Sequence, residues 1–73
     1  MKPDEALDKT MNALIFIEVD VTHLKNAIWN LKQNYKNVDF PTMKKYQESI
    51  IARINDLIEQ LKIIKAILEA IQW

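Results

Sequence analysis

The chain contains no cysteine and no glycine among its 73 residues. Without cysteine, neither disulfides nor thiolate metal ligands can reinforce so small a fold, which must therefore rely on packing. The absence of glycine excludes the glycine-rich loops that bind phosphates and the tight β-hairpin turns that require this residue. The chain therefore has neither the disulfides that stabilise many small domains nor the glycine-rich phosphate-binding loops of many nucleotide-binding enzymes.

Residues that perform catalysis or bind metals are scarce. The only histidine, His23, lies three residues after Asp20, a spacing found in di-iron helical bundles. Neither residue falls on an apolar stripe, and no expected core position is acidic, so the pair is interpreted as solvated. Ser49, the only serine, is far along the chain from His23. We therefore expect no catalytic residue, metal site or cofactor, and a protein that acts by binding and is not an enzyme.

Long hydrophobic runs are also missing. No apolar run approaches the 18 residues or so that indicate a transmembrane helix. The first twenty residues contain five acidic side chains against two lysines, which does not match a secretory signal. The sequence predicts a soluble, cytoplasmic protein that does not bind membranes.

Two apolar stripes with alternating three- and four-residue spacing mirror each other about Asp39. They predict an all-α fold, an antiparallel two-helix hairpin, with helices over residues 4–36 and 42–72 and a turn at 37–41 in a single domain. The first stripe consists of Leu7, Thr10, Leu14, Ile17, Val21, Leu24, Ile28, Leu31 and Tyr35. The second consists of Met43, Gln47, Ile50, Ile54, Leu57, Leu61, Ile64, Leu68 and Ile71. The hairpin core is predicted to contain Leu14, Ile17, Val21, Leu24, Ile28, Ile50, Ile54, Leu57, Leu61 and Ile64.

The expected turn has residues suited to helix ends. Pro41 suits the first turn of the second helix, and Asp39 or Thr42 can serve as its N-cap. Asn37 is expected to adopt the left-handed conformation that commonly ends a helix.

The segment Ile15–Thr22 also has the alternating pattern of a β-strand. A strand there would outline a ribbon-helix-helix protein. However, the heptad spacing continues through the segment, and Glu18 and Asp20 would face DNA with the wrong charge. A continuous helix is therefore the main prediction, and the strand is the alternative.

Apolar residues beside the stripes predict a larger assembly. A stripe this wide indicates that each helix contacts two neighbours, which favours a homodimer of hairpins forming a four-helix bundle. The predicted oligomer interface consists of Ala6, Ala13, Ala27, Ile51, Ile58 and Ile67. A further group outside both stripes, Ile15, Phe16 and Val19, is a candidate patch for a protein partner.

Charge is polarised although the net charge is zero. The segment His23–Arg53, which forms the tip of the hairpin, has a net charge of +4, and the remainder has −4. An antiparallel dimer would place each basic tip beside an acidic end. Alternatively, the tip would bind nucleic acid through its cationic side chains. The candidate contacts are Lys25, Lys32, Lys36, Lys44, Lys45 and Arg53.

In architecture alone, the expected hairpin resembles the Rop family of plasmid copy-number regulators, dimeric hairpin bundles that bind paired RNA loops. No residue motif is shared, so the resemblance transfers no functional residue. The two functional hypotheses are therefore a dimeric module for protein interaction or regulation and a nucleic-acid-binding regulator.

Overall fold

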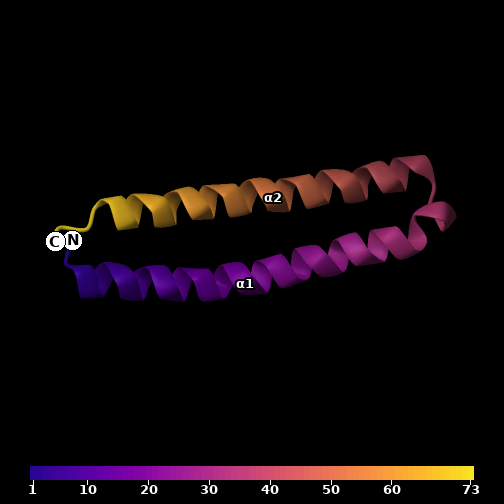
Figure 1. The fold of residues 1–73 in the computed structure, drawn as a ribbon. Coiled ribbons are helices and arrows are strands. Elements are labelled where there is room, and N and C mark those ends of the chain that lie inside the picture. Colours follow the sequence, from indigo (N-terminus) through magenta and orange to yellow (C-terminus); the bar gives the residue numbers. More distant parts are fainter.

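The computed structural model describes all 73 residues as two long helices joined by a short turn. The helices are α1 (Pro3–Asn34) and α2 (Phe40–Glu69), with a 3-10 turn, η1 (Tyr35–Asn37), between them. They run antiparallel, side by side, and the two termini meet at one end (Figure 1). The predicted all-α hairpin is confirmed. Ile15–Thr22 is helical throughout, so the strand alternative is wrong.

Local sequence accounts for where each helix begins. Pro3 and Pro41 lie in the first turns, where a missing N–H leaves no helical hydrogen bond unmade. Asp4 and Glu5 complement the positive end of the α1 dipole. Asp39 occupies the N-cap position of α2, but its side chain makes no capping hydrogen bond.

The turn reverses the chain without a left-handed residue. No residue has positive φ, so the expectation that Asn37 adopts a left-handed cap is wrong. Instead α1 tightens into η1, and Val38 follows with extended backbone (φ −115°, ψ 137°). At the opposite end, the Gln72 N–H donates to the carbonyl of Met1 at 3.2 Å, which joins the two termini.

The contact between the helices lies beside the predicted stripes and only partly coincides with them. Just four residues are buried: Ala6, Thr10, Ile17 and Ile64. The least exposed side chains of α1 beyond its first turn recur with heptad spacing at Ala6, Thr10, Ala13, Ile17, Leu24, Ala27 and Leu31. Those of α2 beyond its first turn are Met43, Ile50, Leu57, Gln60, Ile64 and Ile67. Five positions of the predicted stripes are therefore replaced by the residue just before them. Ala6, Ala13 and Ala27 take the place of positions 7, 14 and 28 on α1, and Gln60 and Ile67 take the place of positions 61 and 68 on α2.

Small side chains explain this rotation of the contact. Ala6, Ala13 and Ala27, here called the alanine row, let α1 approach α2 more closely than a row of leucines would. Thr10 belongs to the same contact, and its hydroxyl donates to the Ala6 carbonyl at 2.8 Å, so no buried polar group is unpaired. Successive residues are roughly 100° apart around a helix axis, and one of the two heptad rows in the contact has shifted by one residue. The side of each helix that faces the other is therefore rotated by roughly 50° from the prediction.

The hairpin is a thin rod. Its extents are 55 × 16 × 10 Å, and its radius of gyration is 16.8 Å, against about 11 Å for a compact domain of this length. Neither helix contains a segment that is both long and apolar enough to cross a lipid bilayer.

Candidate functional site

The rotation leaves one side of the hairpin apolar and uncovered. The heptad row beside the contact consists of Leu7, Leu14, Val21 and Ile28 on α1 and continues to Tyr35 at the start of η1, all of them 40–48% exposed. The matching row on α2 contains Ile54, Leu61 and Leu68, all of them 38–48% exposed. These eight residues are called the apolar face below. Half-exposed side chains of this size, continued along both helices, are an unusual surface for a helical monomer.

The two rows lie on the same side of the molecule. Tyr35 ends the α1 row, and Gln47 begins the α2 row seven residues before Ile54. Both residues line one hollow of about 500 Å³ beside the turn. Heptad rows run parallel to the axes of two antiparallel helices, so two rows that are adjacent near the turn stay adjacent along the whole hairpin. The eight side chains therefore form a continuous surface.

The predicted core residues divide between the contact and the apolar face. Ile17 and Ile64 are buried, and Leu24, Ile50 and Leu57 are half-buried within the hairpin. The other five remain exposed on the apolar face: Leu14, Val21, Ile28, Ile54 and Leu61.

The residues predicted for an oligomer interface also divide. Ala6 is fully buried, and Ala13, Ala27 and Ile67 are half-buried, all in the contact between α1 and α2. Ile51 and Ile58 remain exposed on the row of α2 that borders the apolar face. They widen that face on the side away from the contact.

A row of charges borders the apolar face on α1. Asp4, Glu18, Lys25 and Lys32 lie at seven-residue intervals or their multiples, with exposed Met11 completing the row. This row is called the charged edge. The ion pairs within the chain are Lys9–Glu5, Lys62–Glu59 and Lys65–Glu69, so none of its charges has an ionic partner. The row changes sign along the helix, from acidic near the termini to basic near the turn.

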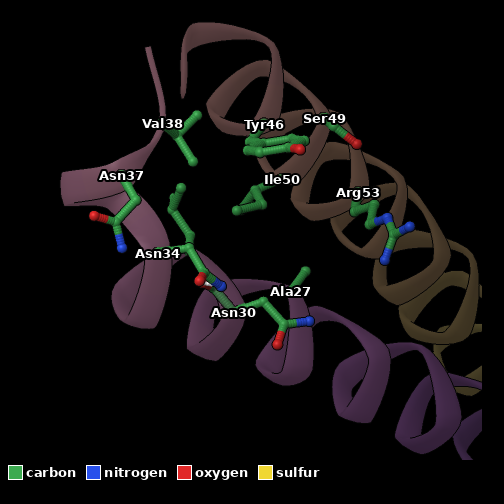
Figure 2. Close-up of a pocket in the computed structure, with 10 residues that line it drawn as sticks. Ala27, Asn30, Asn34, Asn37, Val38, Tyr46, Ser49, Ile50 and Arg53 are labelled. Carbon is green, nitrogen blue, oxygen red and sulfur yellow. Dashed lines mark hydrogen bonds between the residues drawn. The ribbon is translucent and has the colours of Figure 1, made fainter. Parts of the chain in front are cut away.

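The side opposite the apolar face contains a polar cleft near the turn (Figure 2). Its volume is about 740 Å³. Asn30 and Asn34 enter it from α1, and Ser49 and Arg53 from α2, with the Ile50 side chain between them (Figure 2). The complete lining is Ala27, Asn30, Leu31, Asn34, Asn37, Val38, Tyr46, Ser49, Ile50 and Arg53.

The cleft offers hydrogen-bonding groups above an aliphatic floor. The Asn34 amide donates to the Asn30 carbonyl at 2.8 Å, which leaves its side-chain oxygen free to accept. Arg53 has no ion pair and no side-chain hydrogen bond within the chain. Its guanidinium therefore presents unused donors at the edge of the cleft.

Of the predicted nucleic-acid contacts, Arg53 alone lines this cleft. Lys44 lines the hollow beside the apolar face, and Lys25 and Lys32 belong to the charged edge. Lys36 and Lys45 are exposed outside both hollows. The structure therefore distributes the six cations around the tip without gathering them on one surface. The asparagines and Ser49 could be assigned to one cleft only after the register of the two helices was known.

The candidate partner patch is separate from the apolar face. Ile15, Phe16 and Val19 are exposed, Phe16 by 71%. Ile63 on α2 is 62% exposed and had not been singled out from the sequence. Asp56 and His23 line a common hollow. Ile63 lies seven residues after Asp56 on α2, and Phe16 lies seven residues before His23 on α1, so each lies on the same helix face as its partner and toward the termini. Phe16 and Ile63 therefore lie on the same edge of the hairpin.

That common hollow is polar and small, about 160 Å³. The Gln60 amide donates to Asp20 Oδ2 at 3.4 Å across the two helices. No group of three or more histidine, cysteine or carboxylate side chains has an arrangement that could hold a metal ion. His23 and Asp20 are both exposed, so their position is that of a solvated pair.

Comparison of the chain with protein-family models, curated proteins and solved structures finds no match.

Proposed function

We propose that the protein is a homodimer in which two hairpins form a four-helix bundle through their apolar faces. The observation that supports this is the apolar face itself. Eight large apolar side chains remain 38–48% exposed along both helices of the isolated chain. Covering them with a second copy would remove them from water at a gain of about 25 cal/mol per Å² of apolar surface.

The surface area of the chain supports the same proposal. The hairpin exposes 6051 Å², whereas a compact monomer of 8.6 kDa is expected to expose about 4,700 Å². The difference, roughly 1,300 Å², exceeds the approximately 800 Å² that each partner buries in a stable interface. The isolated hairpin therefore has enough excess surface for a dimer contact of ordinary size.

The proposed dimer acts by binding and is not an enzyme, as an interaction or regulatory module. Neither hollow on the polar side is lined by a nucleophile beside a general base, because Ser49 and His23 line different ones. The patch formed by Ile15, Phe16 and Val19 lies off the apolar face, so it would stay accessible for a protein partner in the bundle.

Sedimentation equilibrium over a concentration series tests the proposal. A dimer predicts a mass of twice 8.6 kDa at high concentration, falling toward one chain on dilution. A mass of one chain at every concentration, with a sharp unfolding transition in the most dilute sample, would exclude the bundle.

The polar cleft favours a second candidate function, binding of single-stranded nucleic acid. Asparagine amides can hydrogen-bond base edges, Tyr46 can stack on a base, and Arg53 can contact phosphate. The cleft lies opposite the apolar face, so it would remain open in the proposed dimer.

A titration with single-stranded RNA at two salt concentrations tests this second function. Arg53→Gln is expected to weaken binding at least fivefold, because it removes the only cation of the cleft. Lys36→Gln, a matched loss of charge outside the cleft, is expected to change binding less than twofold. Absence of binding by the unmodified protein at low salt would eliminate this function.

A further inference from the structure

The charged edge of α1 contains one pair of opposite charges, Glu18 and Lys25, that would face each other in a reversed second copy. Glu18 lies beside Leu14, and Lys25 beside Val21, at the four-residue spacing that places two side chains on one helix face. Read from the termini to the turn, the edge is acidic, apolar, acidic, basic and basic. A second copy of α1 running in the opposite direction would present Lys25 to Glu18 and Lys32 to Met11.

We propose that the second hairpin lies with its tip at the opposite end and its α1 against the α1 of the first copy. This inference rests on the proposed dimer and specifies its geometry. With the two-fold axis near residues 21 and 22, Glu18 of each copy faces Lys25 of the other. The same axis passes through the middle of the α1 row of the apolar face, which is centred on Val21.

The other symmetric packing of two apolar faces brings both tips to the same end. In that arrangement α1 lies against α2 of the other copy. The row of α2 that borders the apolar face contains Lys44, Ile51, Ile58 and Lys65, with no acidic residue. Lys32 would then approach a second lysine, Lys44, and the two +4 tips would lie side by side. Charge repulsion between the two adjacent basic tips opposes this packing, whereas the reversed arrangement places each basic tip at the acidic end of the other copy.

Charge reversal tests the geometry. Each facing pair occurs twice in a symmetric dimer, so Glu18→Lys or Lys25→Glu alone is expected to weaken dimerisation about tenfold. The double variant Glu18→Lys/Lys25→Glu is expected to recover affinity to within about threefold of the unmodified chain. The matched controls are Asp8→Lys and Lys45→Glu, which lie off the charged edge and are expected to change affinity less than twofold.

A distance measurement gives an independent result on the otherwise unmodified dimer. Because the chain has no cysteine, a spin label on Lys36→Cys marks the tip uniquely. The proposed arrangement separates the two labels by about 29 residues of helix, or about 43 Å. Tips at the same end would place the labels about two helix diameters apart, within about 25 Å.

The outcomes distinguish this inference from the proposed function. A dimer with distant labels and rescue in the double variant supports the reversed arrangement. A dimer with labels within about 25 Å, or with no effect of either reversal, contradicts the arrangement and leaves the proposed function standing. Failure of the unmodified chain to dimerise overturns both.

Discussion

At the residue scale, alanine decides which apolar side chains the hairpin covers. Ala6 is fully buried, whereas Leu7, its neighbour in the chain, is 40% exposed. Leucine would bury more apolar area, but the alanine row lets the backbones approach and so packs the isoleucines of α2 more closely. The larger side chains are consequently left on the outside, where another helix pair can cover them.

This division could not be predicted from the sequence. Ile17 and Leu24 belong to the contact under either orientation of α1, so their position near the core was predictable. The alanine row and the row beginning at Leu7 flank them on opposite sides, and both are apolar. Periodicity indicates that the stripe is wide, but the choice of flank depends on how closely the two backbones pack.

A matched pair of substitutions on α2 separates the apolar face from ordinary surface. Leu61→Glu places a charge within the proposed interface and is expected to weaken dimerisation at least 100-fold, because an unpaired charge would have to be buried. Ile63→Glu makes the same kind of change at a more exposed apolar position outside the face, and it is expected to have less than a threefold effect. Sedimentation equilibrium gives both affinities, and circular dichroism checks that each variant is helical. Equal effects at the two positions would indicate that the face is not the interface.

At the scale of the elements, the helices and their order followed from the sequence, whereas the geometry of the turn did not. Two uninterrupted heptad stripes and Pro41 were enough to predict two helices and their antiparallel order. Asn37 was expected to end α1 in the left-handed conformation, but α1 ends at Asn34 and continues as η1. The conformation of the 3-10 turn depends on where α2 packs against α1, which the local sequence does not specify.

Substitution of Asn37 reports on this turn. Because its φ is negative, glycine there gains nothing from its conformational freedom and adds entropy to the unfolded chain. Asn37→Gly is expected to lower the free energy of unfolding by about 0.5–1 kcal/mol, measured by urea denaturation at constant protein concentration. Asn37→Ala, the control, is expected to stay within about 0.5 kcal/mol of the unmodified chain. A gain in stability with glycine would instead reveal a left-handed residue.

At the scale of the whole molecule, the hairpin has a different surface on each side. The apolar face with its charged edge is on one side, and the cleft with Arg53 is on the other. The mirror symmetry of the sequence predicted that two helices pair, but not that opposite sides would differ in polarity. Asn30 on α1 and Ser49 on α2 come together only through the register of the hairpin, so the cleft had no signal within either helix alone.

The small core also bears on assembly. With four buried residues in 73, the isolated hairpin has little apolar burial to offset the conformational entropy lost on folding. Dimerisation and folding are therefore expected to be coupled, so the midpoint of thermal unfolding should rise with protein concentration.

Sedimentation equilibrium of the unmodified chain across a concentration series, with thermal unfolding recorded on the same samples, tests the central claim most directly. We predict a mass of twice 8.6 kDa that falls on dilution, together with an unfolding midpoint that falls in parallel. A mass of one chain at all concentrations, with a sharp unfolding midpoint independent of concentration, would contradict the proposal that the apolar face binds a second copy.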